Sequence, residues 1–369
     1  MSAHSGLHEA LAHCVRRGLT FAAFRVPGEP VRLWAQRDPR ETTTDWPGLS
    51  AKERVFIMAP FAMDPGQVPF VRAEIELTFP QDAPHAGVLD ECAGAEETRA
   101  DPGPATARQD FLDAVNAARQ ACAQGVLAKV VLSRAMDADI PPERWPGLFT
   151  WALEDNHHTL VAMARTPSGG LWMGASPERL VTAKGNHVSV DSIAATRPAE
   201  SLPPTIREWG PKELDEQGKV TTYVRDILER LHLGDVKTVG PAVLAAGPVA
   251  HLHTVLEAGL GDVPLAELVA RLHPTPAVCG VPTGEAQHFI RSHEKHDRSL
   301  YAGFWGPWNP SGRTDLFVNL RCMRHVAGRT QLMVGAGITR GSEATMEWTE
   351  TERKARTWLR APGITAHAD

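Results

Sequence analysis

Cysteine, basic charge and long apolar runs are all scarce in this sequence of 369 residues, and each scarcity excludes a class of protein. The five cysteines are odd in number, widely scattered and form no CxxC pair, which argues against a disulfide framework or a zinc site. The sequence contains no run of about 18 apolar residues, the length needed to span a membrane. Residues 1–18 lack a basic start followed by an apolar stretch, so we expect no signal peptide. These features predict a protein of the reducing cytoplasm with no membrane partner.

An excess of positive charge is missing as well. The chain has 38 lysines and arginines against 44 aspartates and glutamates, which gives a formal net charge of −6. This balance offers no general attraction for nucleic acid, and we expect no nucleic-acid partner. The hydrophobic share of 43% is ordinary for a globular protein, and the length allows one large domain or two ordinary ones.

The common phosphate-binding loops are also absent. No GxGxxG follows a strand-like segment, and no GxxxxGK[ST] occurs. The short GAG at 335–337 is not a nucleotide fingerprint, and by itself it is typical of a bulge or a tight strand end.

The sequence contains instead many short apolar segments that come in neighbouring pairs. Segments of strand-like composition lie at 54–61, 71–79, 126–140, 159–165, 170–176, 179–197, 249–260, 314–326 and 330–338. Segments with helical spacing lie at 111–125, 212–234, 265–273 and 345–359. Because the strands are grouped rather than alternating with helices, we expect an α+β fold with large antiparallel sheets. The stretch 81–107, rich in Pro, Ala, Gly and acidic residues, is expected to be a mobile surface loop.

Two of the predicted helices repeat one acidic pattern. Glu213 and Glu216 are three residues apart, as are Glu347 and Glu350, so each pair shares one helix face. Like charges at this spacing repel each other unless a cation offsets them. Four carboxylates from two helices could hold Mg2+, which prefers oxygen ligands and accepts an anionic substrate as a further ligand. The alternative for either helix alone is an acidic face in contact with solvent.

Two charged residues occupy unusual positions: one lies within an otherwise apolar segment, and the other lies where two strand segments meet. Lys129 lies inside VLAKVVLS, where it either reaches solvent from an edge strand or is a partly desolvated amine that can accept a proton. Glu178 follows Pro177 where two strand segments meet. It is either a turn residue or a carboxylic acid that stays protonated and acts as a general acid.

Three further features are open to a structural or a functional interpretation. His251 and His253 alternate along one strand and would share a face. Arg321, at the end of LFVNLR, could form an ordinary ion pair or a bidentate pair with a carboxylate. The stretch LHPTPAVCGVP, residues 272–282, holds three prolines, which exclude a regular helix or central strand. We expect a rigid, largely buried turn around Ala277.

In order and spacing, these features together resemble the chorismate-binding enzyme family. The segments KVVLSR, GASPERL, AATRP, KELDEQ, LHPTPAVCGVP, YAGFWG, LFVNLR, GAGI and EWTETERK follow the family's order over about residues 111–359. The family includes isochorismate and salicylate synthases and the synthase components that make anthranilate and aminodeoxychorismate. The resemblance implies a single α+β domain of extended antiparallel sheets packed together with helices outside. Residues 1–106 would be its N-terminal part, 107–362 the catalytic region and 363–369 a C-terminal tail.

The resemblance also implies roles for these residues. Lys129 matches the general base of the water-using members, where ammonia-using members usually carry glutamine, and Glu178 matches the general acid. Mg2+ would bridge protein and substrate, with Glu216 and Glu350 as direct ligands and Glu213 and Glu347 as the supporting pair. The substrate-binding positions are matched by Ala195, Thr196, His251, Ala277, Tyr301, Arg321, Gly335, Gly337 and Lys354.

Two positions depart from the family pattern. The usual Ala-Gly-Thr reads Ala194-Ala195-Thr196, and the added methyl group is expected to narrow the approach of the backbone to the substrate. The usual Glu-His of the metal helix reads Glu216-Gln217. This second departure concerns the surroundings of the metal rather than its ligands.

The resemblance therefore implies a magnesium-dependent isochorismate synthase, an isomerase that adds water at C2 of chorismate as hydroxide leaves C4. Chorismate would be the small-molecule substrate, and the lysine at position 129 argues against an obligatory glutaminase partner. Isochorismate synthases carry alanine at the position of Ala277, whereas salicylate synthases carry threonine. A salicylate synthase, an ammonia-using synthase component and a catalytically silent chorismate-binding module are the alternatives. The product would enter menaquinone or catechol siderophore biosynthesis.

Overall fold

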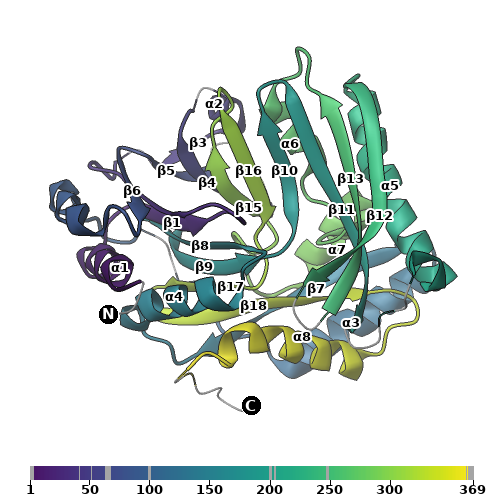
Figure 1. The fold of residues 1–369 in the computed structure, drawn as a ribbon. Helices are drawn as coiled ribbons and strands as arrows, with labels where there is room; N and C mark the ends of the chain where they lie inside the picture. Colours follow the sequence, from purple (N-terminus) through teal and green to yellow (C-terminus); the bar gives the residue numbers. More distant parts are fainter. Residues whose placement is uncertain are drawn as a thin grey trace.

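The computed structural model describes residues 4–40, 42–50, 52–62, 68–98, 101–198, 202, 205–246, 249–362 and 364. It contains two nine-stranded antiparallel sheets that face each other, with helices on their outer sides (Figure 1). This arrangement confirms the predicted α+β class and its large antiparallel sheets. No helix within the described ranges combines the length and the apolar character needed to cross a bilayer.

The first sheet joins strands from both ends of the chain. Every pair of neighbouring strands in it is antiparallel. In spatial order its strands are β14 (Gly280–Val281), β7 (Lys129–Ala138), β18 (Arg329–Ile338), β17 (Cys322–Val326), β9 (Gly170–Ser176), β8 (Leu160–Thr166), β1 (Phe21–Arg25), β2 (Val31–Ala35) and β6 (Ile75–Phe79).

The second sheet has the same number of strands and is also antiparallel. Its longest strands, β11–β13, form one end and stand upright beside β10 in Figure 1. In spatial order its strands are β12 (Gly234–Ala246), β13 (Val249–Gly259), β11 (His187–Pro198), β10 (Arg179–Lys184), β16 (Arg313–Val318), β15 (Phe304–Trp308), β4 (Val55–Ala59), β5 (Val68–Arg72) and β3 (Thr43–Thr44).

Alternation along β1 shows why both faces of its sheet are apolar. Ala22 and Phe24 point into the core between the two sheets, where Phe24 packs against Phe56 of the second sheet with ring centroids 5.1 Å apart. Phe21 and Ala23 point the other way, into a second core under the helices. A strand with apolar side chains on both faces therefore reads as a continuous apolar run rather than as a clean alternation.

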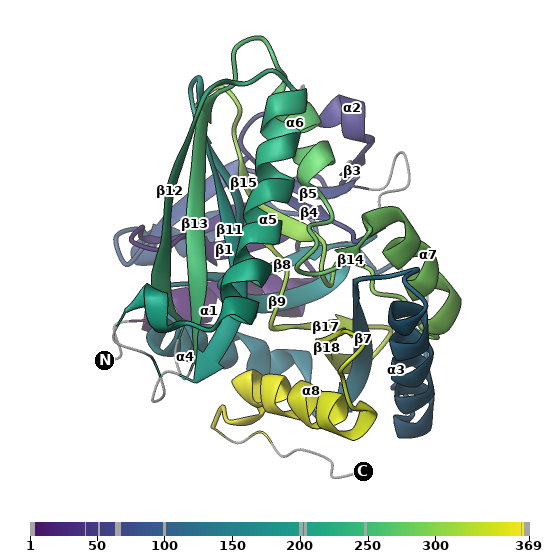
Figure 2. The same ribbon diagram turned by 90° about the vertical axis from the view of Figure 1, so that its right-hand side faces the viewer.

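The helices cover the outer faces of both sheets. Figure 2 shows α5 lying along β11–β13, with α8 beneath β7 and β18 and α3 beside β7. The α-helices are α1 (Ser5–Arg17), α2 (Trp46–Leu49), α3 (Arg108–Ala123), α4 (Trp145–Asp155), α5 (Pro211–Arg230), α6 (Leu265–Leu272), α7 (Thr283–His293) and α8 (Ala344–Leu359). Short 3-10 segments are η1 (Ala83–Glu91), η2 (Pro142–Arg144) and η4 (Ile206–Glu208).

Two expectations for the N-terminal part were wrong in detail. The stretch 81–107 was expected to be a surface loop, but η1 lies within it, and Leu89 and Cys92 are buried in the core beneath α1. The segment 71–79 was expected to be one strand, but it is divided between β5 and β6, which belong to different sheets. In both cases contacts between distant parts of the chain decide the structure, and local composition does not contain them.

Candidate active site

Lys129 is the first residue of β7 and lies between two neighbouring strands. Val281 of β14 pairs with it on one side, and β18 runs along the other. Its side chain passes over Gly337, because a methyl group built at that glycine would lie 3.0 Å from the Lys129 Cε. The ammonium lies 3.5 Å from Glu216 Oε1, and 27% of the side chain is exposed. Lys129 is thus half-buried and paired, not extended freely into solvent.

Glu178 occupies the short link between β9 and β10, where the sequence predicted a strand junction. Its carbonyl accepts a hydrogen bond of 2.9 Å from the Val318 amide. Burial raises the pKa of its carboxyl from 4.5 to about 7; the positive charge of Lys129 opposes this rise, and the negative charge of Asp191 adds to it. A substantial share of this carboxyl therefore carries a proton at neutral pH and can donate it.

Asp191 in β11 is a buried carboxylate that the sequence analysis did not single out. Its side chain is 7% exposed, and its Oδ2 lies 3.4 Å from His253 Nε2 and 3.6 Å from Arg179 Nε. These contacts place His253 in a polar cluster with Asp191 and Arg179. The signal that could have found Asp191 is the one used for Lys129, a charge within a strand segment.

Three of the four predicted metal ligands each contact a cationic side chain. The glutamates lie on two helices, α5 and α8, and their partners come from β7, β11 and α8. Glu347, the fourth, lies one turn before Glu350 on α8. The pairs, with the distance between the charged atoms, are Lys129–Glu216 at 3.5 Å, Lys354–Glu350 at 3.6 Å and Arg197–Glu213 at 2.9 Å.

The donor chemistry of this set suits Mg2+, although the carboxylates are not gathered around one point. Across the residues that the structure describes, no three His, Cys, Asp or Glu side chains lie close enough together to hold a metal ion. Each of the three paired carboxylates nevertheless draws a positive charge to itself, and carboxylate oxygens are the ligands that Mg2+ prefers. The magnesium site stays a prediction.

The Gly335–Gly337 segment of β18 supports two other predicted residues. Lys354 Nζ donates a hydrogen bond of 2.8 Å to the Gly335 carbonyl. The Tyr301 hydroxyl would lie only 2.6 Å from a methyl group built at Gly335, so a larger residue would displace the tyrosine. Tyr301 is itself buried, and burial raises its pKa. The glycines thus allow Tyr301, Lys354 and Lys129 to approach one stretch of backbone.

His251, Arg321 and Lys354 come from three distant segments but share one electrostatic environment. Burial lowers the pKa of His251 to about 4, and the positive charges of Arg321 and Lys354 lower it further. Burial also lowers the pKa of Arg321 and of Lys354, although Glu350 opposes the change at the lysine. A neutral imidazole beside two cations is suited to an anionic ligand.

Ala195 lies at an irregularity in β11. The register with β13 shifts between Ala194 and Thr196, and Ala195 has a φ of +57°, a left-handed conformation that favours glycine. Its methyl group packs in a small core with Trp209 and Leu252. The backbone of Thr196 pairs with His251, but the Thr196 side chain lies outside the described residues.

The stretch 272–282 forms a largely buried turn, as expected from its prolines. The amides of Val278 and Cys279 both donate to the Thr275 carbonyl, at 3.1 and 3.0 Å. Residues 275–278 therefore form a β-turn with Ala277 in its third position. The chain then pairs with β7 through β14 and continues into α7.

Thr275 and His273, in the first half of this stretch, have different surroundings. The Thr275 side chain lies close enough to the Glu178 carboxyl to oppose the rise of that pKa. His273 Nε2 lies 3.1 Å from the Phe61 carbonyl, and burial lowers the pKa of His273 to about 4, so the ring is neutral and structural. Ala277, two residues after Thr275, is half-buried.

Gln217, the second departure from the expected pattern, faces the sheet beneath its helix. Its amide nitrogen donates to the Ser192 carbonyl at 2.9 Å and lies 3.0 Å from Thr254 Oγ1. These bonds tie α5 to β11 and β13 directly behind Glu216. Gln217 therefore has a clear structural role in holding the acidic helix.

A hollow of about 540 Å³ lies away from all these residues, at the end of α1. Arg17, Arg165, Glu97 and Glu143 are among the residues that line it. Because its positive and negative side chains nearly balance, its lining favours no particular class of ligand.

Comparison with known protein families gives one strong match. A family model described as chorismate binding enzyme matches residues 89–363, which begins earlier than the motifs recognised in the sequence. The vibriobactin-specific isochorismate synthase of Vibrio cholerae is 34% identical over 252 residues, which cover 64% of this chain and 62% of that protein. The isochorismate synthase DhbC of Bacillus subtilis is 30% identical over 319 residues, covering 81% of this chain and 80% of that protein.

Solved structures with the same arrangement of sheets cover nearly the whole chain. The menaquinone-specific isochorismate synthase MenF of Escherichia coli matches with a TM-score of 0.73 and 21% identity, over 95% of this chain and 91% of that one. Anthranilate synthase component I of Streptococcus pneumoniae matches with a TM-score of 0.69 and 20% identity, over 93% and 91%. At such identities these two likenesses establish the fold alone.

Proposed function

Since this chain belongs to the chorismate-binding enzyme family, we propose that it is a magnesium-dependent isochorismate synthase. It would add water at C2 of chorismate and release the C4 hydroxyl, which makes it an isomerase. The observation that carries this proposal is that the half-buried carboxyl of Glu178, whose pKa is raised to about 7, lies near enough to Lys129 for the charge of the lysine to affect that pKa. The two groups interact electrostatically, as an acid and a base acting on one small substrate should.

The two groups divide the proton transfers between them. Lys129 in its neutral form takes a proton from water while the water oxygen bonds to C2 of the ring. The ring double bonds shift, the C4–O bond breaks, and Glu178 gives its proton to the departing hydroxide. Loss of one proton to Lys129 and gain of one from Glu178 balance the reaction, because water enters and water leaves.

Chorismate is a dicarboxylate, and the site offers cations for it. Arg321 and Tyr301 would take the pyruvyl carboxylate, and Lys354 adds a further positive charge near His251. Thr196 and the backbone of Ala195, Gly335 and Gly337 would complete the binding surface. Tyr301 is buried and Arg321 and His251 are half-buried, which limits the water that would screen their interaction with a charged ligand.

Glu216 and Glu350 would hold Mg2+ directly, with Glu213 and Glu347 in support. When bound, Mg2+ would neutralise the ring carboxylate of the substrate and so stabilise the charge that develops during the reaction. Lys129 and Lys354, which contact two of these glutamates, would then be released toward the substrate.

Two alternatives act on the same substrate. A salicylate synthase would go on to eliminate pyruvate, and Ala277 in place of threonine argues against it. An ammonia-using synthase component would require a glutaminase partner, and Lys129 in place of glutamine argues against that. Relatives are named for vibriobactin and for menaquinone, and we propose that the product supplies a route of one of these two kinds in the cytoplasm.

One assay separates these activities. The purified protein is incubated with chorismate and Mg2+ without ammonia, and the products are identified by chromatography and mass spectrometry. Isochorismate without stoichiometric pyruvate supports the proposal. Salicylate with pyruvate, or no turnover until ammonia is added, contradicts it in favour of the first or the second alternative.

A further inference from the structure

A buried ion pair outside the substrate-binding residues joins the two segments that carry Lys129 and Ala277. Glu294, directly after α7, and Arg298 have side chains that are 5% and 4% exposed. Arg298 donates to the Glu294 carboxylate in bidentate fashion, from Nη2 at 2.6 Å and from Nε at 2.7 Å. A pair this deeply buried is costly unless further hydrogen bonds satisfy both partners.

Arg298 uses its remaining donors to connect two separate backbone segments. Its Nη2 lies 2.6 Å from the Val131 carbonyl, two residues after Lys129 in β7. Its Nη1 lies 3.2 Å from the Val278 carbonyl, the residue that follows Ala277 in the turn. One planar guanidinium thus spans the strand of the proposed base and the turn that borders the substrate site.

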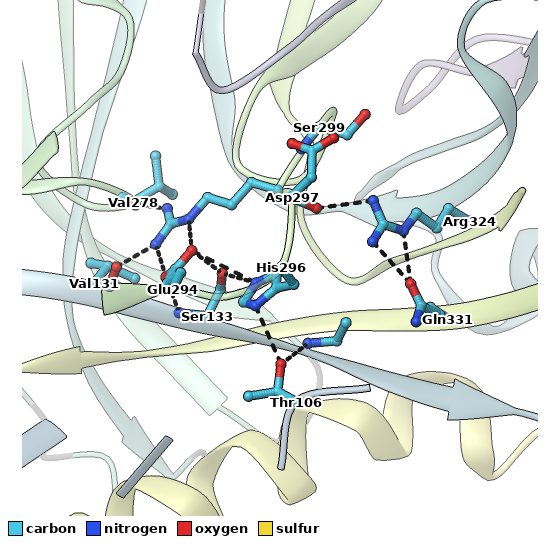
Figure 3. A network of polar contacts seen from close by, with 12 residues as sticks. Thr106, Val131, Ser133, Val278, Glu294, His296, Asp297, Ser299, Arg324 and Gln331 are labelled. Carbon is cyan, nitrogen blue, oxygen red and sulfur yellow. Dashed lines mark hydrogen bonds and ion pairs between the residues drawn. The ribbon is translucent and has the colours of Figure 1, made fainter. Parts of the chain in front are cut away.

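Glu294 fixes the same strand with the two oxygen atoms that accept from Arg298. Its carboxylate accepts hydrogen bonds from the Ser133 amide at 2.7 Å and from the Ser133 hydroxyl at 3.0 Å. Figure 3 shows Glu294, Ser133 and His296 together between the strand and the loop after α7. The carboxylate and the guanidinium therefore hold β7 at residues 131 and 133, immediately beyond Lys129.

The neighbouring histidine completes a directed chain of hydrogen bonds. Burial lowers the pKa of His296, so its ring is neutral. Its Nε2 lies 2.9 Å from Ser133 Oγ and its Nδ1 lies 3.2 Å from Thr106 Oγ1. Because the Ser133 hydroxyl donates to the Glu294 carboxylate, it accepts from Nε2–H of His296, and Nδ1 of the neutral ring accepts from the Thr106 hydroxyl. Every proton in this chain points toward the Glu294 carboxylate.

The direct pairing between the turn and β7 is short and needs this support. β14 has only two residues, and the bonds that join it to β7 include Ala128 N to Val281 O and Val131 N to Cys279 O, both 2.8 Å. A two-residue edge strand is weak by itself. We infer that Glu294 and Arg298 are positioning residues that set the placement of Lys129 relative to the turn around Ala277. This inference rests on the proposed function for its consequence in catalysis.

The test compares two buried arginines: Arg298, which donates to the backbone of β7, and Arg134, which is itself part of β7. Arg298→Lys keeps the charge but loses the planar fork that reaches both carbonyls, and Glu294→Gln is the second variant if lysine prevents folding. The control is Arg134→Lys, because Arg134 in β7 is also buried and donates to Thr351 Oγ1 at 2.7 Å, away from the turn. Amide hydrogen exchange over residues 128–131 and 278–281, chorismate affinity and kcat are measured for each protein.

We expect Arg298→Lys to raise exchange at least tenfold in these two segments and to lower kcat at least tenfold, with chorismate affinity changed less than threefold. Arg134→Lys should leave exchange in both segments and kcat within threefold of wild type. Unchanged exchange in Arg298→Lys would overturn the inference, and so would raised exchange with an unchanged kcat. If wild type makes no isochorismate, the proposed function fails, while the exchange measurement still decides whether the pair holds the two segments together.

Discussion

The Nζ atom of Lys129 lies 3.5 Å from Oε1 of Glu216, so the proposed base and a proposed metal ligand are partners in this structure. One residue comes from the first strand after α3 and the other from α5, far along the chain. In this arrangement Glu216 occupies the amine that is proposed to take a proton from water. Catalysis therefore requires that Glu216 be engaged elsewhere when Lys129 accepts a proton from water.

Replacing Lys129 with glutamine should nearly abolish isochorismate formation. Loss of a general base typically costs about 10²–10⁴-fold in rate. Chorismate affinity should change much less, because Arg321 and Lys354 remain. Steady-state kinetics and calorimetric binding would measure both quantities. Lys184→Gln, at the exposed end of β10, is the matched control and should behave as wild type. A Lys129→Gln enzyme that keeps more than a third of the wild-type rate would exclude lysine as the base.

The acid should impose a limit on activity at alkaline pH. The raised pKa of Glu178, about 7, means that its proton-donating form decreases as pH rises through 7. Because the neutral fraction of Lys129 rises with pH while the protonated fraction of Glu178 falls, we expect the slope of log kcat against pH to decrease by one unit near pH 7. Glu178→Gln should lose this break and about 10²–10⁴-fold of the rate at pH 7. A pH–rate profile that stays flat from pH 6 to 9 in wild type would contradict the assignment.

The raised pKa of Glu178 should also make the folded protein less stable as pH rises. Between pH 4.5 and about 7 the folded protein holds this proton while the unfolded chain has lost it. The free energy of unfolding therefore decreases as pH rises across this window and levels off above it. Glu178→Gln lacks this penalty, so at pH 8 it should be more stable than wild type, by an amount on the order of 2 kcal/mol. Urea unfolding at pH 5 and pH 8 tests the difference.

Glu350→Gln should weaken both Mg2+ binding and the dependence of activity on Mg2+. The proposed ion would bridge protein and substrate, so chorismate affinity should fall as well, and higher Mg2+ should recover part of the loss. Isothermal titration with Mg2+ in the absence of substrate gives a measurement that does not depend on turnover. Glu343→Gln, at the exposed start of the same helix, is the control. Full activity after complete chelation in wild type would remove the metal from the proposal.

The sequence predicted the strands and helices that carry the site because their apolar patterns are local. Lys129 and Glu178 could be found for the same reason, since each interrupts an apolar segment or joins two strands. Asp191 could have been noticed as a charge within a strand segment, but its partner His253 and the Arg197 partner of Glu213 could not be assigned, because they lie on other elements. The contact between Arg298 and two carbonyls depends on a pairing of segments almost 150 residues apart, which no local pattern contains.

Ala195→Gly should leave the free energy of unfolding nearly unchanged, because two effects of opposite sign nearly cancel. The left-handed φ of Ala195 costs roughly 1 kcal/mol that glycine would not pay. Glycine would also lose a methyl group packed with Trp209 and Leu252, worth about 0.8 kcal/mol. We expect a change in the free energy of unfolding below about 0.5 kcal/mol, measured by urea. A decrease in the free energy of unfolding above about 2 kcal/mol would show that the methyl contacts dominate. An increase above about 2 kcal/mol would show that relief of the backbone strain dominates.

Ala277→Thr should convert part of the product into salicylate and pyruvate. Ala277 is the third residue of a β-turn that is held by Thr275, by the pairing with β7 and by Arg298, so a side chain added here has a fixed direction. A threonine hydroxyl can hydrogen-bond to bound isochorismate and hold the geometry that pyruvate elimination needs, whereas a methyl group cannot. A coupled lactate dehydrogenase assay on both proteins measures pyruvate. Wild type should release little, and the variant a measurable amount. Ala277→Ser supplies the hydroxyl with less bulk, so pyruvate from neither variant would mean that Ala277 is only a small residue required by the turn. Pyruvate from wild type in step with chorismate loss would identify a salicylate synthase instead.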